Sequence, residues 1–432
     1  MKKYFIKTFG CQMNVYDSWR IAAMLDARGM TATKDVADAD IIILNTCSVR
    51  EKATNKVFSE LGRVRDAKKP DALFGIVGCV AREVGANAFH RIPELNFVLG
   101  PQSYHRLPEI LDDPDTKLLN IDLTGLEKFD ELPQMTTAPT VSYIPIQEGC
   151  NHCCTYCIVP FTRGPEISRS FDDVIRDTLH AAKTGAVEIC FLGQNVNGYK
   201  YTDENGNVFR LSDLIRETAK IPEIRRIRFT SSYPTEMTDD LIQMFATEPK
   251  LLPFLNMPIQ SGSPDVLRRM NRPYSLDSYL NIINKLRTAR PDIQISSDFI
   301  VGFPDETDED FKQTLEIARR VRYINSYSFK YSPRPHTAAA LMPNQVPEKT
   351  KRERLAILDN TLNEIQREFN ETCVGKKLNC LYEGPDKTGK HLLYRTPYMQ
   401  QCIVAHTDTP QQMATIEITA ANRASLRGKI VD

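Results

Sequence analysis

The stretch Glu148-Gly-Cys-Asn-His-Cys-Cys-Thr-Tyr-Cys-Ile158 follows an apolar run and places several cysteines on one short loop. Its key spacing is Cys150-x3-Cys154-x2-Cys157. Three thiolates on a tight loop can hold three irons of a [4Fe–4S] cubane, and the fourth iron then stays open to a chelating substrate or cofactor. The stretch therefore predicts an iron–sulfur site that takes part in chemistry.

A zinc site is the alternative, because Cys150-x2-Cys153 and Cys154-x2-Cys157 are formally two C-x2-C pairs. Zinc knuckles usually separate their pairs by about a dozen residues or more, so that two turns can meet around a tetrahedral ion. Here the pairs are adjacent, which favours the iron–sulfur cluster. Cys153 could replace Cys154 as a ligand, but the x3/x2 spacing favours Cys154 and makes Cys153 a bystander.

Around this loop, residues 141–372 are typical of a partial (β/α)6 barrel with a trailing charged helix over 348–372. Strand candidates separated by helical segments lie at 142–147, 188–192, 226–230, 254–258, 294–301 and 326–331. The chemistry of such barrels takes place at the carboxyl ends of the strands. Polar residues there are candidate cofactor contacts, namely Gln194, Asn195, Gln260, Ser261 and Asp298. Each could instead satisfy only local backbone groups.

Residues 1–118 alternate apolar runs with helix-like segments, which predicts a doubly wound parallel α/β domain. The apolar runs lie at 4–8, 41–45, 74–77 and 97–99, and the helical segments at 17–28, 51–67 and 82–90. Cys11, Cys47 and Cys79 each come just after one of the first three apolar runs. Because the carboxyl ends of neighbouring parallel strands share one edge, we expect these cysteines to converge and to hold a second cluster with an open iron. The alternative is three buried free cysteines.

The remaining parts of the chain differ from these two regions in character. The segment 107–140 is rich in Pro, Asp, Thr and Leu without a steady period, so we expect little structure there and take 119–140 as a linker. Residues 373–432 contain five short strand-like runs at 377–382, 391–394, 401–404, 415–419 and 429–431, which predict a small five-stranded β-barrel of the OB type. This part has eight Lys and Arg against five Asp and Glu, which gives it a net charge of +3. The excess of positive charge is either a chance fluctuation or a feature that serves RNA binding.

The whole chain of 432 residues is long enough for about three domains. Lys plus Arg and Asp plus Glu both number 55, so any RNA contact must come from a local patch. We find no signal-peptide core and no apolar stretch of membrane-spanning length, and we expect the cytoplasm, where the 11 cysteines stay reduced. Outside the two triads, we expect Cys190, Cys373, Cys380 and Cys402 to be core residues; a zinc site using the last three would need His391 or His406.

Over nearly its whole length the sequence resembles the methylthiotransferase family of radical S-adenosylmethionine enzymes. Besides the two cysteine triads, the motifs that carry the resemblance are Thr8-Phe-Gly-Cys-Gln-Met-Asn14, Asn45-Thr-Cys-Ser-Val-Arg50, Leu192-Gly-Gln-Asn-Val196, Gln260-Ser-Gly-Ser263 and Ser297-Asp-Phe-Ile-Val-Gly-Phe-Pro304. The resemblance implies a radical S-adenosylmethionine barrel in the middle of the chain, S-adenosylmethionine as a cofactor beside the two [4Fe–4S] clusters, and a C-terminal TRAM domain that binds RNA.

Within this family, Gly10-Cys-Gln-Met-Asn14 is similar to the branch that makes 2-methylthio-N6-isopentenyladenosine in tRNA. Branches that modify a ribosomal-protein aspartate typically have Gly-Cys-Pro-Lys-Asn there, and those acting on threonylcarbamoyl-adenosine have Gly-Cys-Lys-Val-Asn. The resemblance thus implies transfer of a methylthio group to C2 of N6-isopentenyladenosine at position 37 of tRNA. One S-adenosylmethionine would donate the methyl group and a second would be the radical source.

The resemblance also implies partners and leaves alternatives. The partners are the tRNA anticodon stem–loop and an electron donor such as flavodoxin or ferredoxin, with no membrane and a monomeric enzyme. The alternative substrates are threonylcarbamoyl-adenosine in tRNA and a ribosomal protein. The non-enzymatic alternative is an iron–sulfur carrier with an RNA-binding module.

Overall fold

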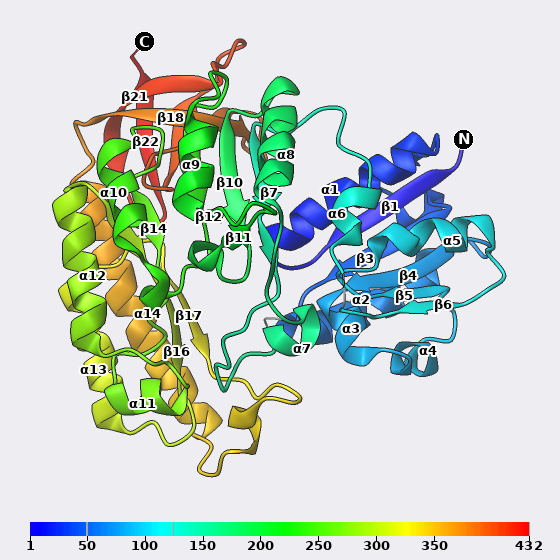
Figure 1. The fold of residues 1–432 in the computed structure, drawn as a ribbon, viewed down its shortest axis with the longest axis horizontal. Coiled ribbons are helices and arrows are strands. Elements are labelled where there is room, and N and C mark those ends of the chain that lie inside the picture. The colour runs from blue at the N-terminus through cyan, green and yellow to red at the C-terminus, as the bar shows by residue number, and fades with distance from the viewer. Residues whose placement is uncertain (49–50, 124, 432) are drawn as a thin grey trace.

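The computed structural model describes residues 1–48, 51–123 and 125–431. Val49 and Arg50 of the Asn45–Arg50 motif, Thr124 of the expected linker and Asp432 at the end of the predicted β-barrel lie outside these residues. Figure 1 shows an N-terminal α/β unit in blue and cyan, a larger barrel-like unit in green and yellow, and a small β-barrel in orange and red. No helix among the described residues is long and apolar enough to span a membrane.

The N-terminal unit is built on a sheet in the order β2-β1-β3-β4-β5-β6, in which every described pair is parallel. The strands are β1 (Lys3–Thr8), β2 (Thr31–Ala32), β3 (Ile41–Thr46), β4 (Leu73–Gly78), β5 (Phe97–Leu99) and β6 (Leu118–Asn120), and the helices are α1 (Gln12–Ala27), α2 (Glu51–Ala67), α3 (Cys79–Val84), α4 (Asn87–Arg91) and α5 (Leu107–Asp112). All of β3 is buried, and alternate isoleucines of this strand enter separate apolar cores on the two faces of the sheet. The predicted doubly wound α/β fold is confirmed.

Two predicted helices of this unit have different bounds. The helix predicted over 17–28 begins at Gln12, because Cys11 is its N-cap and the Asn14 side chain accepts a hydrogen bond from the Cys11 amide at 3.3 Å. Cysteine is not a usual capping residue, so the start was not apparent from the sequence. The helix predicted over 82–90 is divided into α3 and α4, with the break at Gly85 and Ala86.

The expectation of little structure between residues 107 and 140 is wrong. This segment contains α5, β6 and the helix α6 (Glu127–Glu131). Arg20 of α1 is buried and donates to the carbonyl oxygens of Phe129, Leu132 and Pro133, which fixes the segment onto the sheet unit. Bonds from a distant side chain to backbone carbonyls leave no periodic pattern in the local sequence, which explains the wrong expectation.

The central unit is a partial parallel barrel. Its main strands are β7 (Val141–Pro145), β10 (Glu188–Leu192), β13 (Arg226–Phe229), β14 (Phe254–Asn256), β15 (Gln294–Ser296), β16 (Asp298–Val301) and β17 (Tyr327–Lys330). Parallel pairs join β7, β10 and β13, then β14 with β15 and β16 with β17, and bridges at Ile227–Leu251 and Gln260–Phe299 continue the sheet. The predicted strands are confirmed, except that the one over 294–301 is two strands that meet at Ser297.

Helices cover one face of this curved sheet and bury its apolar side chains. They are α8 (Phe171–Lys183), α9 (Leu211–Ala219), α10 (Asp239–Thr247), α12 (Leu276–Ala289) and α13 (Asp308–Val321). The short helix α11 (Pro264–Arg269) packs in a separate cluster with Phe303 and Tyr331. Smaller elements of the central unit are α7 (Val159–Arg163), the pairs β8 (Gln147–Glu148) with β9 (Ile167–Ser168) and β11 (Lys200–Thr202) with β12 (Val208–Arg210), and 3-10 helices at Val196–Gly198, Pro234–Glu236 and Ala338–Leu341. The N-terminal unit has 3-10 helices at Val36–Asp38 and Tyr104–Arg106.

The helix α14 (Glu348–Glu371) leads into a closed β-barrel in the order β18-β19-β20-β22-β21. The strands are β18 (Lys377–Pro385), β19 (His391–Arg395), β20 (Gln401–Ala405), β21 (Met413–Ala421) and β22 (Ser425–Ile430). The predicted five-stranded barrel is confirmed, and Cys373, Cys380 and Cys402 lie in its apolar core as expected.

This β-barrel packs against the amino ends of the central strands. Arg226, the first residue of β13, donates to the carbonyl oxygens of Arg395 at 2.8 Å and Thr396 at 3.1 Å. The cysteine loop of residues 150–157 instead follows β7 and β8 at the carboxyl end of the sheet. The two features therefore lie at opposite ends of the central unit, as Figure 1 shows for β18 and α7.

Candidate metal centres

Cys11, Cys47 and Cys79 come together at the carboxyl edge of the N-terminal sheet. Cys11 caps α1 after β1, Cys47 follows β3, and Cys79 is the first residue of α3 directly after β4. The three strands are neighbours in the order β1-β3-β4. Cys11 is exposed while Cys47 and Cys79 are buried, so solvent reaches the group at Cys11. We refer to these three cysteines as the N-terminal triad.

Two glycines allow the three loops to approach this closely. Gly10 has a φ of +134°, and a Cβ atom on it would lie 2.4 Å from the Cβ atom of Cys47. Gly78 has a φ of +91°, and its added Cβ atom would lie 2.5 Å from the carbonyl oxygen of Thr46. Both positions combine a left-handed backbone with a contact that no side chain could accommodate. The glycines before Cys11 and Cys79 are therefore part of the site.

Asn14 and Asn45 fasten the same loops by buried hydrogen bonds. The Asn14 amide nitrogen donates to Asn45 Oδ1 at 2.9 Å and to the carbonyl oxygen of Thr46 at 3.1 Å. In return, Asn45 Nδ2 donates to the carbonyl oxygen of Asn14 at 2.8 Å and to Ser18 Oγ at 2.9 Å. These bonds give a physical role to two motif asparagines to which sequence reasoning assigned no role.

The surroundings of the N-terminal triad shift the pKa values of its thiols in different directions. A hydrogen bond with Cys47 lowers the pKa of the Cys11 thiol to about 6, and the charge of Arg163 acts in the same direction. Burial raises the pKa of the Cys79 thiol above its ordinary value. Arg163 Nε donates to the Cys79 sulfur at 3.4 Å, so this buried thiol has a cation beside it.

Cys150, Cys154 and Cys157 form the second group, which we refer to as the barrel triad. The loop is held by backbone bonds from Cys157 to Cys154 at 3.0 Å and from Cys150 to the carbonyl oxygen of Gly164 at 3.2 Å. Burial raises the pKa of the Cys150 thiol to about 11 and that of Cys157 to about 12. Cys153 is exposed, and its sulfur lies 3.7 Å from the carbonyl oxygen of Asn151.

Several residues around the barrel triad were not predicted as site residues. His152 stacks on Tyr233 with ring centroids 3.6 Å apart and lies 3.0 Å from Glu236 Oε1. Arg272 lies over the same tyrosine ring and donates to the Tyr156 hydroxyl at 3.0 Å. Tyr233 and Glu236 follow the barrel strand β13, so the rule that chemistry lies beyond the strand ends could have found them. No local signal marks His152 or Arg272.

Two of the predicted cofactor contacts lie directly beside the barrel triad. Gln194 Oε1 accepts a hydrogen bond from the amide of Gly149 at 2.5 Å. Asn195 is buried and donates to Glu236 Oε2 at 2.6 Å and to Glu166 Oε2 at 3.2 Å, while its Oδ1 accepts no hydrogen bond from the described residues. A buried acceptor without a donor is suited to a ligand that brings its own N–H or O–H group.

The other three predicted contacts lie at the fourth and fifth strand positions. Gln260 has a φ of +73°, and its backbone amide donates a hydrogen bond to the carbonyl oxygen of Asp298 at 2.9 Å. Ser261 is buried, and its hydroxyl lies 3.3 Å from Thr314 Oγ1 and accepts from the amide of Ser263 at 3.2 Å. Asp298 is half-buried at the start of β16. Ser261 thus makes the local bonds that the alternative interpretation expected.

Gln147 is a further residue that sequence reasoning missed. It is buried at the end of the first strand position, and among the described residues neither atom of its side-chain amide has a hydrogen-bond partner. A Cβ atom on Gly193 would lie 2.6 Å from Gln147 Cγ, so the amide borders the loop that carries Gln194 and Asn195. Its position at the end of a predicted strand could have marked it as a candidate site residue.

The donor groups of both triads fit iron–sulfur clusters better than a single ion. In the part of the chain that the structure describes, no three His, Cys, Asp or Glu side chains lie close enough to bind one metal ion. The thiolates of a cubane each bind a different iron, so they do not need to meet around one point. Three soft sulfur donors on glycine-bordered loops suit a cluster with one open iron.

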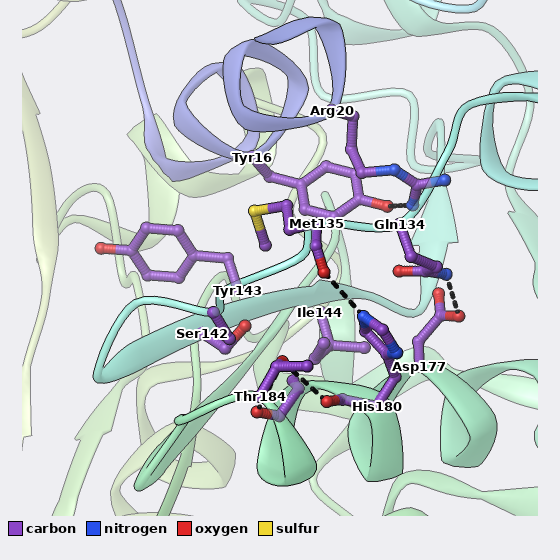
Figure 2. Close-up of a pocket in the computed structure, with 12 residues that line it drawn as sticks. Tyr16, Arg20, Gln134, Met135, Ser142, Tyr143, Ile144, Asp177, His180 and Thr184 are labelled. Atoms are coloured by element: carbon purple, nitrogen blue, oxygen red, sulfur yellow. Dashed lines mark hydrogen bonds between the residues drawn. The ribbon is translucent and has the colours of Figure 1, made fainter. Parts of the chain in front are cut away.

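A cavity at the junction of the units is too small for a substrate. It lies between α1, residues 134–135, β7 and α8, and Figure 2 shows Tyr16, Arg20, Gln134 and His180 around it. The space for water-sized molecules is ≈ 10 Å³, which suits at most one water. His180 Nε2 lies 2.7 Å from the carbonyl oxygen of Met135, and Gln134 donates to Asp177 at 2.7 Å, so these contacts fix the segment before β7.

Comparisons with known proteins agree with this arrangement. Residues 3–100 match the Uncharacterized protein family UPF0004, and residues 144–318 match the Radical SAM superfamily. A tRNA-2-methylthio-N(6)-dimethylallyladenosine synthase from Rickettsia canadensis (strain McKiel) is 46% identical over 442 residues, covering 99% of each chain. The synthase of the same description from Rickettsia felis (strain ATCC VR-1525 / URRWXCal2) is 46% identical over 443 residues, covering 100% of each chain.

Solved structures give the same fold at low identity. The radical S-adenosylmethionine methyltransferase TsrM from Kitasatospora setae aligns with a TM-score of 0.56 and 11% identity, over 89% of this chain and 79% of that chain. The cobalamin-dependent radical enzyme OxsB aligns with a TM-score of 0.52 and 12% identity, over 82% of this chain and 56% of that chain. Since the curated relatives match from end to end at 46% identity, the chain belongs to the family of tRNA-2-methylthio-N(6)-dimethylallyladenosine synthases, which are radical S-adenosylmethionine enzymes.

Proposed function

We propose that this protein transfers a methylthio group to C2 of N6-isopentenyladenosine at position 37 of tRNA. The observation that carries the proposal is the pair of separate cysteine triads, each at the carboxyl ends of parallel strands, in a chain 46% identical to synthases of this name. One cluster alone would explain radical formation but not a source of sulfur. Two S-adenosylmethionine molecules are required, one as methyl donor and one as radical source.

Members of the Radical SAM superfamily use a [4Fe–4S] cluster and S-adenosylmethionine. We infer that Cys150, Cys154 and Cys157 hold this cluster, and that Cys11, Cys47 and Cys79 hold a second one. When bound, the first cluster supplies the electron that cleaves S-adenosylmethionine and the second supplies a site for the transferred sulfur. The polypeptide holds the cysteines on hydrogen-bonded loops and places buried polar groups beside them.

We infer that the cofactor contacts are Gln194, Asn195, Gln260, Ser261 and Asp298. Support is strongest for Asn195, whose buried Oδ1 has no donor among the described residues and lies beside the barrel triad. Gln194 has less support than Asn195, because its Oε1 already accepts a hydrogen bond from the Gly149 amide. Ser261 has the least support, because its hydroxyl contacts Thr314 and Ser263.

We further propose the organisation and the partners. Residues 1–118 and 141–372 would each hold one cluster, joined by 119–140, and residues 373–432 would bind the tRNA anticodon stem–loop as a TRAM domain. The net charge of +3 on that last part, eight basic against five acidic residues, supports RNA binding. Because its substrate is tRNA, the enzyme would act in the cytoplasm, as a monomer that takes electrons from flavodoxin or ferredoxin.

The test is a reaction of anaerobically reconstituted protein with isopentenylated tRNA, S-adenosylmethionine and dithionite, followed by mass analysis of the nucleosides. The expected product is 2-methylthio-N6-isopentenyladenosine. Product only from threonylcarbamoyl-adenosine tRNA or from ribosomal protein would reassign the substrate. Failure to cleave S-adenosylmethionine under reduction would favour the iron–sulfur carrier.

A further inference from the structure

A buried arginine connects the two triads. Arg163 is the last residue of α7, six positions after Cys157. Its Nε donates to the sulfur of Cys79 at 3.4 Å, and its Nη1 donates to Glu148 Oε1 at 2.5 Å. The Arg163 side chain is 4% exposed, so water hardly competes for these contacts. One side chain therefore reaches from the loop of the barrel triad to a cysteine of the N-terminal triad.

The charges around Arg163 are balanced without the cysteine. Arg163 Nη2 lies 3.7 Å from Asp17 Oδ2, and Lys128 Nζ lies 3.3 Å from Asp17 Oδ1 and 2.9 Å from Glu148 Oε2. Two cations thus face two carboxylates, all of them nearly or fully buried. A thiolate at Cys79 is an additional negative charge, and Arg163 is the cation of this group that has a hydrogen bond to it.

The backbone on both sides of this residue is also fixed. Gln102 Nε2 donates to the carbonyl oxygen of Arg163 at 2.9 Å, from the N-terminal unit. The next carbonyl oxygen, of Gly164, accepts from the amide of Cys150 at 3.2 Å. These bonds fix the backbone that carries Arg163, and the bond to Glu148 holds its guanidinium beside Cys79.

We propose that Arg163 is a positioning residue for the N-terminal cluster, which holds the Cys79 sulfur by a charge-assisted hydrogen bond and makes that cluster easier to reduce. One-electron reduction adds a negative charge to the cluster, and hydrogen bonds and cations at the ligand sulfurs stabilise that charge. Arginine suits the task because its guanidinium stays charged when buried and donates in several directions. The inference rests on the proposed function, since it requires a cluster at the N-terminal triad.

The experiment uses the full chain with Cys154→Ala, so that only the N-terminal cluster remains. Iron content is measured first, and then the midpoint potential is determined by titration with dithionite, followed by the EPR signal of the reduced cluster. In this background, Arg163→Gln should move the midpoint to more negative potential and alter the EPR signal. Arg163→Lys, which keeps the charge and can keep the pair with Glu148, should give a smaller shift in the same direction.

Lys128→Met is the matched control, because it removes the other cation of the same buried group without touching a cysteine. It should leave the midpoint closer to that of the parent than Arg163→Gln does. Equal shifts of the midpoint in Arg163→Gln and Lys128→Met would overturn the inference while leaving the second cluster in place. An unchanged midpoint in Arg163→Gln and Arg163→Lys would do the same. Absence of iron from the Cys154→Ala parent would instead overturn the proposed function, and the inference with it.

Discussion

At the scale of single residues, Cys11 separates the two activities that the proposed function combines. It belongs to the N-terminal triad and comes from a different unit than the cysteines of the barrel loop. Cys11→Ala should therefore still produce deoxyadenosine from S-adenosylmethionine with dithionite, yet form no methylthio product on tRNA. Chromatography of both products from one reaction measures this.

The controls for Cys11→Ala lie in the barrel loop. Cys154→Ala should abolish both products, whereas Cys153→Ala should abolish neither, because Cys153 is an exposed neighbour outside the expected ligand set. If a folded Cys11→Ala protein makes the methylthio product at the parent rate, the N-terminal triad does not hold the sulfur.

Asn45 determines how well the three loops of the N-terminal triad are held. Asn45→Ala removes buried bonds to Asn14 and Ser18, and each buried group left without a partner costs about 1–3 kcal/mol. The free energy of unfolding, measured with urea, should therefore fall by at least the cost of one such group. Asn205→Ala, on an exposed turn, should change it by less than about 0.5 kcal/mol. A stable Asn45→Ala protein would show that the loops are held by other means.

At the scale of elements, the turn between β18 and β19 is the strongest candidate for RNA binding. It carries exposed Lys387 and Lys390, and the corresponding loop of OB-type barrels commonly binds oligonucleotides. Changing both lysines to glutamate should weaken tRNA binding and lower the slope of log affinity against log salt by about 1 for each phosphate that the variant no longer neutralises. Filter binding over a range of salt concentrations measures both quantities.

The control for this turn is Lys349→Glu, at an 87% exposed lysine side chain on α14. Cleavage of S-adenosylmethionine should be unchanged in the turn variant, because the small β-barrel packs at the end of the central unit away from the barrel triad. Equal losses of tRNA affinity in the turn variant and in Lys349→Glu would mean that only general charge matters and that this turn has no special role.

At the scale of the whole molecule, the two triads predict the iron content. Anaerobically reconstituted protein should bind about eight irons, four for each cubane. Cys154→Ala and Cys47→Ala should each reduce this number to about four, and the double variant should bind almost none. Colorimetric iron and sulfide assays give the count, and a value of about four for the unchanged protein would exclude the second cluster.

The sequence by itself determined most positions of the main strands, the doubly wound N-terminal unit and the small β-barrel. Apolar runs such as 41–45 record local burial, and a cysteine directly after such a run must lie at the carboxyl edge of the sheet. The positions of Cys11, Cys47 and Cys79 at one edge therefore followed from the chain alone. Which other side chains contact these cysteines did not follow from the sequence.

The tertiary structure alone decided how the units are joined. Arg163 and Cys79 are 84 residues apart, and Arg226 and Arg395 are 169 residues apart, yet both pairs are in contact. The buried Lys128 lies in a segment whose composition suggested a linker with little structure. Buried charges are stable only where they have partners. Partners that come from distant parts of the chain leave no period or spacing in the local sequence, because only the packing of whole units brings them together.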